Sequence, residues 1–402
     1  MAVALDIHGE VAPGFEAVAD TFRANFTERR EVGAAVSCWH RGERVVDLWA
    51  GWADPAAKTP WNADTLGIVF SATKGLVALS FLMLAERGAF DYDQPVAEYW
   101  PEFAEAGKGS ITVRQLLNHR SGLCAIDAPL TIEDFHHPAR VEAALVAQKP
   151  LWPPGEGQGY HAISYGPFAA ALFERIAGTT LGAFLRDEVA GPLDADVFLG
   201  LPEELNPRVA RLLPPGLREK LFEILPALFT DSTEGRLYRQ ALKRGSDTQR
   251  ATSNPAELGA RALHNYDRAD VRALELPWAN GIASARGLAK IYAALAGGGS
   301  LGGVQLLKPE SLELVRERQS YGPDRVLQKT LGWSLGFIKE EPHLFSPNEA
   351  AIGHPGAGGA IGLADPSEEL SVAYVMNRMD TRLRSPRALA LCQSLYGCLS
   401  GL

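Results

Sequence analysis

The hydrophobic pattern at the start of the chain predicts a helix followed by two strands. Residues 33–40 and 44–50 are apolar or alternating, and Arg41-Gly42-Glu43 between them is typical of a turn, so we expect a β-hairpin. Before it, residues 13–29 carry apolar side chains at helical spacing, which are Phe15, Val18, Ala19, Phe22 and Phe26.

The middle of the chain has a helical pattern. The apolar stretch from Thr73 to Glu86, which Gly88 ends, predicts a buried helix, and residues 111–119 predict a short helix capped by Thr112. Residues 202–277 are amphipathic and irregular, and we interpret them as a peripheral helical insertion at the mouth of a pocket.

Strand patterns return near the end of the chain, at residues 331–337, 360–364 and 370–377, and residues 386–399 predict a closing helix. The predicted fold class is therefore α/β in the α+β sense, with a sheet built from both chain ends, flanking helices and an inserted, mostly helical domain. We expect the sheet domain at residues 1–75 plus 285–402 and the helical domain at residues 76–284.

Composition narrows the function. The 402 residues carry a net charge of −9, with 46% hydrophobic residues, so a globular protein is expected and a nucleic-acid partner is not. We expect a cytoplasmic protein without a membrane partner, because the sequence has no secretory signal pattern and no uncharged apolar run of about 18 residues. The four cysteines form no metal-binding motif, and we expect no metal and no cofactor.

The main chemical motif is Ser71-Ala72-Thr73-Lys74 at the start of the predicted buried helix. Unpaired N–H groups and the positive end of the helix dipole surround a serine at such a position. Lys74 lies one turn along on the same face, and burial there would favour its neutral amine, which is able to accept the serine proton. The alternative is a simple N-cap beside a solvated lysine.

A second serine motif is Gly298-Gly299-Ser300-Leu301-Gly302, which matches the hydrolase elbow G-x-S-x-G. That elbow needs a strand before the serine and a helix after it. Here a predicted helix precedes the serine and glycines break it, so we expect Ser300 in a helix-ending turn without a catalytic role.

Five segments in order resemble the serine β-lactamase and penicillin-binding superfamily, and most closely the family VIII carboxylesterases. They are the Ser71 to Lys74 motif, Ile111 to Leu123 (close to T-v-x-x-L-L-x-H-x-S-G-L), Trp152-Pro-Pro-Gly155 with Tyr160 to Gly166 in the place of Y-x-N, Asn280 to Ala289, and Gly353 to Gly359 in the place of K-T-G. The resemblance implies a central antiparallel sheet flanked by helices.

The resemblance also implies roles for individual residues. Ser71 is similar to the acylated nucleophile, Lys74 to its activating partner and Tyr160 to the tyrosine that moves the proton, with Tyr165 as the alternative tyrosine. A Lys74 ammonium would favour the Tyr160 phenolate, so we expect the two to titrate as a coupled pair. The N–H groups of Ser71 and Ala357 would form the oxyanion hole.

The pattern departs from the β-lactamases at three positions. Ala162 stands where Asn is expected, and His354 and Pro355 replace the lysine and threonine of K-T-G. These side chains would hold a lactam, so their loss favours esters, and His354 would be charged only part of the time at pH 7.

Four further positions are candidate pocket residues: Trp152, Asn280, His354 and Gly356. Trp152 and Trp278 would form an apolar acyl pocket, although tryptophans beside proline loops often serve only the core. Asn280-Gly281 also fits a plain turn before a helix capped by Ser284.

The sequence thus predicts a serine carboxylesterase for small to medium esters, working through a Ser71 acyl-enzyme. Acyl transfer with the same residues, weak β-lactamase or D-amino-acid peptidase activity, and a non-catalytic assembly role are the alternatives. The expected partner is a small-molecule ester, and the oligomeric state is open.

Overall fold

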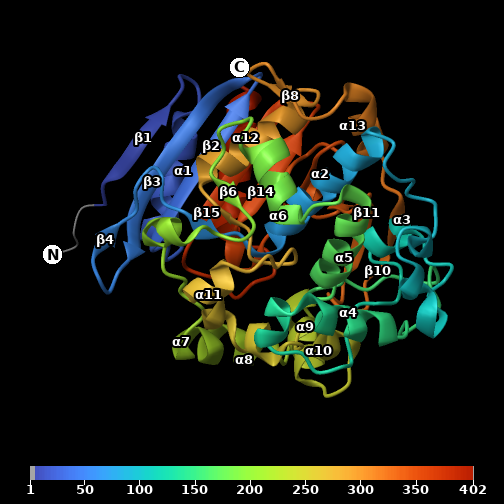
Figure 1. Cartoon of the computed structure of the whole chain (residues 1–402). Coiled ribbons are helices and arrows are strands. Elements are labelled where there is room, and N and C mark those ends of the chain that lie inside the picture. The colour runs from blue at the N-terminus through green and yellow to red at the C-terminus, as the bar shows by residue number, and fades with distance from the viewer. Residues whose placement is uncertain (1–4, 402) are drawn as a thin grey trace.

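A ten-stranded antiparallel sheet forms the centre of the computed structural model, which describes residues 5–401 (Figure 1). The strand order is β1-β3-β2-β15-β14-β13-β12-β11-β10, with β4 paired to β3. The strands are β1 (Ile7–Val11), β2 (Gly33–His40), β3 (Glu43–Asp54), β4 (Thr59–Pro60), β10 (Ser320–Pro323), β11 (Thr330–Ser334), β12 (Phe337–Ile338), β13 (Ile352–Pro355), β14 (Ile361–Asp365) and β15 (Leu370–Met376).

Helices cover both faces of this sheet. The terminal helices α1 (Glu16–Thr27) and α15 (Pro386–Leu399) pack against each other on one face. On the other face, α12 (Ala285–Ala296) lies against β2, β14 and β15, while α2 (Thr73–Glu86) lies against β12 and β13 (Figure 1). The sheet and α2 share one large hydrophobic core, so the start of α2 is held on a rigid base.

Tyr292 of α12 sets how closely α2 and β14 approach that helix. A Cβ on Gly75 would lie 2.2 Å from the Tyr292 hydroxyl, and one on Gly362 would lie 2.2 Å from the Tyr292 ring. Real Cβ atoms do not approach so closely, so both positions need glycine. The packing therefore fixes α2, and with it the Ser71 to Lys74 motif, beside the sheet.

The remaining elements lie mostly beyond the edge of the sheet at β10 and below it (Figure 1). A small three-stranded sheet connects segments that are far apart in the sequence. Its strands are β5 (Gly67–Ile68), β7 (Ile282–Ala283) and β6 (Val197–Phe198), in that order. The further elements are α3 (Val113–Leu117), α4 (Pro138–Ala147), α5 (Tyr165–Ala177), α6 (Leu181–Phe184), α7 (Leu217–Glu219), α8 (Leu225–Ala227), α9 (Thr233–Leu242), α10 (Asp247–Ala251), α11 (Ala269–Arg272), β8 (Ser300–Leu301), β9 (Val304–Gln305), α13 (Pro309–Arg316) and α14 (Pro342–Phe345).

The fold class is confirmed, as are the hairpin of β2 and β3, the buried helix α2 and the closing helix α15. The single strand predicted at residues 331–337 is wrong. Leu335 and Gly336 have φ values of 47° and 91°, and this turn divides the segment into β11 and β12. The edge strand β1 was not predicted, and the division of the chain into two domains stays a prediction.

Ser300 lies in β8, the first strand of a two-stranded hairpin, and not in a helix-ending turn. No helix follows it directly, since β9 comes next. The elbow geometry is therefore missing, and Ser300 is exposed to solvent.

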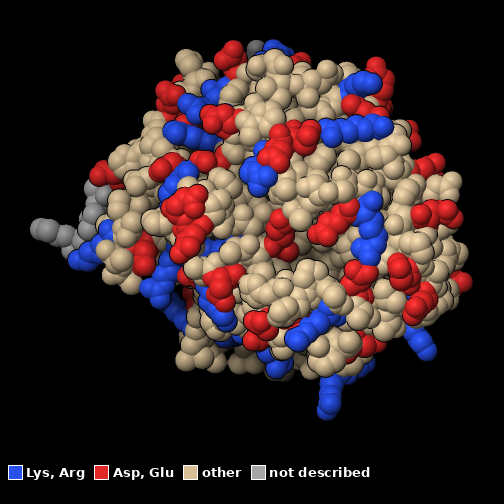
Figure 2. Space-filling view, viewed as in Figure 1, with Lys and Arg blue, Asp and Glu red and all other residues tan. Residues whose placement is uncertain are grey.

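The surface carries charges of both signs. On the face shown in Figure 2, Lys and Arg are interspersed with Asp and Glu, without a broad basic area. Among residues 5–401, no single helix is long and apolar enough to cross a membrane, and α5 with the segment 181–190 reaches that length only across a 67° bend.

Candidate active site

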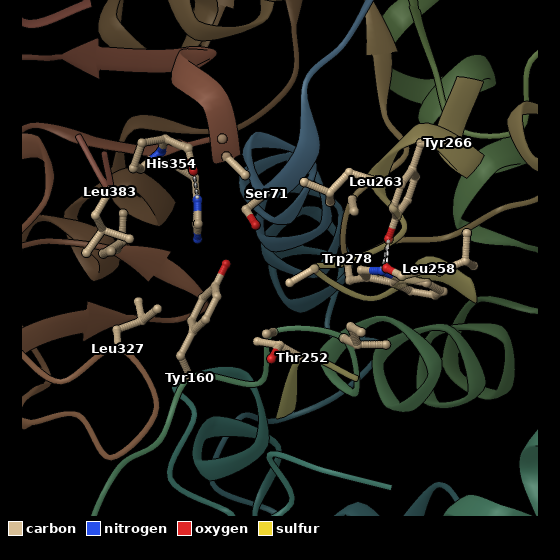
Figure 3. Close-up of a pocket in the computed structure, with 18 of the residues that line it drawn as sticks. Ser71, Tyr160, Thr252, Leu258, Leu263, Tyr266, Trp278, Leu327, His354 and Leu383 are labelled. Carbon is tan, nitrogen blue, oxygen red and sulfur yellow. Dashed lines mark hydrogen bonds between the residues drawn. The ribbon is translucent and has the colours of Figure 1, made fainter. Parts of the chain in front are cut away.

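Ser71 lies in a tight turn, Phe70–Ala72, that leads from β5 into α2. Phe70 has a φ of 46°, an unusual value for a non-glycine residue that marks a constrained backbone. Thr73 secures the turn, because its hydroxyl donates to the Phe70 carbonyl and accepts from the Gly281 N–H at 2.9 Å. The Ser71 side chain is half-buried and faces a cavity (Figure 3).

Lys74 is fully buried directly behind Ser71. Its Nζ lies 2.8 Å from the Trp278 carbonyl oxygen, 3.1 Å from the Ala162 carbonyl oxygen and 3.4 Å from Ser71 Oγ. No carboxylate compensates its charge among the described residues, and burial lowers the pKa of Lys74 well below its ordinary value. The site therefore favours the neutral amine.

Tyr160 points its hydroxyl toward Ser71 across the same cavity (Figure 3). Its ring stacks on Trp333 with the centroids 5.9 Å apart, and its backbone N–H donates to Asp324 Oδ1 at 3.1 Å. Lys74 Nζ lies 4.8 Å from the centre of the ring. The geometry thus brings Ser71, Lys74 and Tyr160 together.

The expected phenolate at Tyr160 is wrong. Burial raises the pKa of Tyr160, and this effect exceeds the lowering by the Ser71 hydroxyl and by Arg384. A neutral Lys74 supplies no ammonium to offset the cost of burying a phenolate. Burial therefore favours the neutral form of both groups, an amine and a phenol.

His354 also lines the cavity, and its Nδ1 donates to the Pro355 carbonyl oxygen at 2.8 Å. A carbonyl only accepts, so Nδ1 carries the proton and Nε2 is left with a lone pair, for which the described residues offer no partner. Burial lowers the pKa of His354 to about 3. The expectation of a partly charged His354 at pH 7 is therefore wrong.

Two further buried histidines, His119 and His161, lie behind Tyr160. His119 Nδ1 accepts a hydrogen bond from the backbone N–H of His161 at 3.1 Å. It also lies 2.8 Å from the ring nitrogen Nδ1 of His161. His161 Nδ1 must then be the donor, which leaves His161 Nε2 to accept from the Ser121 hydroxyl at 2.9 Å. These hydrogen bonds fix His161, the residue after Tyr160, and the sequence motifs did not reveal them.

The N–H groups of Ser71 and Ala357 are both without a protein acceptor in the described part of the chain. Ala357 begins a short turn after β13, and the preceding Gly356 N–H is already bound to the Ala360 carbonyl at 2.7 Å. A Cβ on Gly356 would lie 2.1 Å from the Val69 carbonyl oxygen. Gly356 thus lets the end of β13 approach the Ser71 turn closely. Ser71 and Ala357 both line the cavity there.

The cavity has a volume of about 200 Å³ and a mostly apolar wall. Five of its 19 lining residues belong to the 202–277 insertion, which therefore contributes one part of the wall. The lining residues include Ile163, Thr252, Leu258, Ala260, Leu263, Tyr266, Trp278, Leu327, Ile338 and Leu383.

Two of the predicted pocket residues lie elsewhere. Asn280 is buried, and its amide donates to the Val271 and Leu274 carbonyls while its oxygen accepts from the Leu276 N–H at 2.9 Å. It therefore closes a loop. Trp152 packs in the small core behind Tyr160 and does not reach the cavity, whereas Trp278 does.

Arg384 is a pocket residue that no sequence motif indicated. It forms a buried ion pair with Glu341, which also pairs with Lys329 at 2.5 Å. Its positive charge is close enough to lower the pKa of Tyr160. A cation from the C-terminal segment thus reaches the site through the tertiary structure alone.

Among residues 5–401, no group of three His, Cys, Asp or Glu side chains is arranged to hold a metal ion. All four cysteines are free, and Cys38, Cys124 and Cys392 are buried. The cavity is bordered by the hydroxyl of Ser71, the phenol of Tyr160, the imidazole of His354 and the paired guanidinium of Arg384, with the Lys74 amine directly behind Ser71.

Comparison with known proteins identifies the family of this chain. A family model described as Beta-lactamase matches residues 18–393. The esterase/beta-lactamase LipL of Mycobacterium tuberculosis is 35% identical over 376 residues, which cover 93% of this chain and 83% of LipL. The solved structure of a family VIII carboxylesterase is 37% identical with a TM-score of 0.85, covering 98% of this chain and 100% of that one.

A penicillin-binding protein homologue from Caulobacter crescentus is similar to the same extent, with 35% identity, a TM-score of 0.82, and coverage of 98% of this chain and 100% of that chain. Both solved structures are therefore matched over nearly their whole length. The motif order, the antiparallel sheet and the two whole-chain similarities agree, and the chain belongs to the beta-lactamase family of serine hydrolases.

Proposed function

We propose that this protein is a serine carboxylesterase that hydrolyses small to medium carboxylic esters through an acyl-enzyme on Ser71. The observation that carries the proposal is the position of Lys74, whose buried Nζ lies 3.4 Å from Ser71 Oγ without a carboxylate partner among the described residues. An uncompensated buried lysine is costly unless it is neutral, and a neutral amine beside a serine is a general base.

The contacts of Lys74 support the direction of proton transfer. A neutral amine has two N–H donors and one lone pair, and two carbonyl oxygens, those of Trp278 and Ala162, lie within hydrogen-bond distance. When both donors are used in this way, the lone pair is left for the Ser71 hydroxyl. Lys74 therefore takes the proton as Ser71 Oγ attacks the ester carbonyl.

Tyr160 is the proposed proton donor to the leaving alcohol. Its phenol is neutral because burial raises its pKa, and its hydroxyl faces Ser71 across the cavity (Figure 3). In the second half of the reaction a water molecule replaces the alcohol, and the same groups move the proton in the opposite direction. The acyl bond to Ser71 then breaks and the acid leaves.

The developing negative charge on the carbonyl oxygen needs donors that are already in place. The N–H groups of Ser71 and Ala357 are free and come from two elements that Gly356 allows to approach closely. We assign the oxyanion hole to this pair. Loss of one such donor typically costs about 100-fold to 1000-fold in kcat.

Esters are favoured over β-lactams by the side chains that stand in the places of K-T-G and Y-x-N, and the one guanidinium that lines the cavity, that of Arg384, is already paired with Glu341. His354 is neutral and turns a lone pair into the site, so it does not attract a substrate carboxylate. Ala162 contributes only its carbonyl to Lys74 and has no side-chain amide for a lactam. His354 and Gly356 remain the proposed substrate-contacting residues, together with Trp278.

Acyl transfer is the second candidate because a larger cavity of about 670 Å³ adjoins the first. The two cavities share Ala260, Leu263, Ala357 and Leu383. An acceptor alcohol has room there to compete with water for the acyl-enzyme.

The test compares p-nitrophenyl acetate, p-nitrophenyl butyrate and nitrocefin as substrates for the wild type and Ser71→Ala. We expect ester hydrolysis that Ser71→Ala abolishes, a Ser71 acyl adduct by mass spectrometry, and little nitrocefin turnover. Unchanged ester hydrolysis by Ser71→Ala would refute the proposal. A rise in mixed ester when an alcohol is added would identify acyl transfer.

A further inference from the structure

One helical segment of the insertion exposes an unusual number of large apolar side chains. α7, a wider π turn at Lys220–Ile224 and α8 form a continuous helical run from Leu217 to Ala227. Five of the ten exposed large hydrophobic residues in the described chain lie on this run or just after it. They are Leu217 (74% exposed), Leu221 (48%), Phe222 (73%), Leu225 (44%) and Phe229 (84%).

The four of these residues that lie on the helical run share one side of it, and Phe229 follows in the turn after α8. Leu217, Leu221, Leu225 and Phe229 are spaced by four residues, and Phe222 is adjacent to them on the helical surface. An apolar stripe of this kind normally faces a core, whereas here it faces solvent. Nothing in residues 5–401 covers it.

The opposite side of the helix is firmly held. Glu219 pairs with Arg378 at 2.6 Å and with Arg30 at 3.9 Å, while Glu223 pairs with Arg30 and accepts from the Thr381 hydroxyl at 2.6 Å. These contacts fix which side is exposed.

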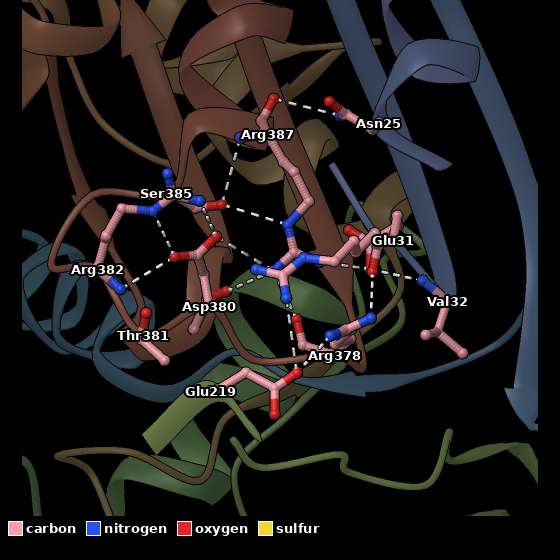
Figure 4. Close-up of polar contacts among 12 residues, drawn as sticks. Asn25, Glu31, Val32, Glu219, Arg378, Asp380, Thr381, Arg382, Ser385 and Arg387 are labelled. Atoms are coloured by element: carbon pink, nitrogen blue, oxygen red, sulfur yellow. Dashed lines mark hydrogen bonds and ion pairs between the residues drawn. The ribbon is translucent and has the colours of Figure 1, made fainter. Parts of the chain in front are cut away.

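The segment that anchors the helix is itself tied to the core (Figure 4). The buried Arg387 binds Glu31 at 2.6 Å and donates to the Arg378 carbonyl oxygen at 2.7 Å, and Asp380 holds Arg382. The apolar stripe is therefore presented by a braced helix and not by a loose end.

The unpaired charges of the helical run are positive, although the chain as a whole has a net charge of −9. Both acidic residues of the helix turn inward and are paired. Arg218 and Lys220 are exposed, and neither has a carboxylate partner among the described residues. At helical spacing Arg218 falls within the apolar stripe and Lys220 lies beside it.

We propose that this face, defined by Leu217, Arg218, Leu221, Phe222, Leu225 and Phe229, docks reversibly on the surface of an anionic lipid bilayer. Apolar side chains on one face of a surface helix enter the boundary between headgroups and acyl chains, and neighbouring cations meet the lipid phosphates. A second copy of this chain is the competing occupant, but it would bring the same Arg218 and Lys220 to the interface and repel its partner.

The position of the helix connects this surface to the cavities. Lys220 and Ile224, on the flank of the helix, line the larger cavity, which joins the Ser71 cavity at Leu263 and Ala357. An ester dissolved in the lipid layer would thus enter beside the docked helix. This extension rests on the proposed esterase function, whereas the docking itself does not.

The test is co-sedimentation of the full chain with vesicles of phosphatidylcholine, with and without phosphatidylglycerol, at low and high salt. We expect binding to the phosphatidylglycerol vesicles that salt weakens. The Phe222→Ser/Phe229→Ser double variant should bind about tenfold more weakly, and Arg218→Gln should lose about half of the salt dependence because Lys220 remains. Leu314→Ser is the matched control, because Leu314 is 55% exposed on α13, outside the stripe, and this variant should bind like the wild type.

Absence of wild-type binding, or equal binding by the double variant, would overturn the proposal. A concentration-dependent dimer that the double variant loses in analytical ultracentrifugation would assign the face to a second copy instead. Hydrolysis of soluble p-nitrophenyl butyrate is measured separately and should be unchanged in the double variant. Vesicle binding by Ser71→Ala keeps a failure of docking distinct from a failure of the esterase proposal.

Discussion

The Nζ of Lys74 lies 2.8 Å from the carbonyl oxygen of Trp278, a residue 204 positions further along the chain. This contact, with that of the Ala162 carbonyl at 3.1 Å, holds the amine beside Ser71 without adding a negative charge. Carbonyl oxygens accept the amine hydrogens but do not keep the group ionised as a carboxylate would. The arrangement therefore positions a buried lysine and leaves it neutral.

Replacement of Lys74 by methionine should reduce kcat/KM for p-nitrophenyl butyrate by about 100-fold to 10,000-fold, because the general base is removed. Lys108→Met is the matched control. Lys108 is also buried, and its Nζ donates to the Glu105, Val146 and Gln148 carbonyls, but it does not line the cavity. Lys108→Met should lower the melting temperature and keep kcat/KM near the wild-type value. Equal activity loss in both variants would refute the role of Lys74.

Tyr160→Phe should lose at least about 100-fold in kcat while the melting temperature changes little, since the ring still stacks on Trp333 and only the proton donor is lost. Tyr165→Phe tests the alternative tyrosine. The Tyr165 hydroxyl is buried without a hydrogen-bond partner among the described residues, so its removal should leave kcat unchanged. If Tyr165→Phe is the inactive variant, the assignment of the tyrosines must be exchanged.

The pH dependence of kcat/KM should follow Lys74. Burial lowers its pKa well below the ordinary value of 10.5, and the active form is the neutral one. The rate should therefore reach its plateau well below pH 10.5 and fall as the pH drops through this lowered pKa. A profile that still rises toward pH 10.5 would show that Lys74 titrates as a solvated lysine.

Stability should fall on mild acidification because of the buried histidines. Burial lowers the pKa of His161 and of His354 to about 3, so in the folded state both stay neutral at pH values where the unfolded chain binds protons. The stabilising contribution is thus present above the unfolded value near 6.5 and is lost as the pH falls below it. Each histidine should cost roughly 1 to 1.5 kcal/mol at a pH about one unit below that value.

Chemical denaturation at a series of pH values measures how steeply the free energy of unfolding falls with decreasing pH. His161→Gln removes the titrating ring and keeps an acceptor for Ser121, so this variant should be less stable than the wild type at neutral pH and should show a flatter pH dependence. An unchanged slope would mean that His161 is not the group that takes up the proton.

Acyl-chain preference should depend on Leu263, which lines both cavities at their junction. Leu263→Trp fills this junction and should lower the ratio of p-nitrophenyl hexanoate to acetate hydrolysis by about tenfold, because each excluded methylene group loses its burial. Leu263→Ala should raise the same ratio. If neither variant changes the ratio, the acyl chain occupies another part of the site.

The sequence alone determined the elements whose pattern is local. The helix at residues 73–86 and the closing helix at residues 386–399 have the predicted bounds, because apolar spacing and the flanking Gly88 and Pro386 are properties of neighbouring residues. The proximity of Ser71 and Lys74 also follows from one helical turn. These features needed no knowledge of the rest of the chain.

The tertiary structure decided the surroundings of these groups. Asn280 and Trp152 fitted a pocket by their place in the motifs, yet the fold uses Asn280 to close a loop and Trp152 to fill a core. Arg384 matched no motif and reaches the cavity from the C-terminal segment. Such positions depend on long-range packing, which local periodicity does not record.

Ionisation was decided in the same way. The sequence placed a lysine, a tyrosine and a histidine in one site, but the neutral state of each depends on burial and on which acceptors lie beside it. Burial is produced by segments far apart along the chain, such as residues 160–163, 276–279 and 352–357. The sequence therefore determined which groups are available for chemistry, and the tertiary structure decided their charge, because the free energy of an ion depends on everything packed around it.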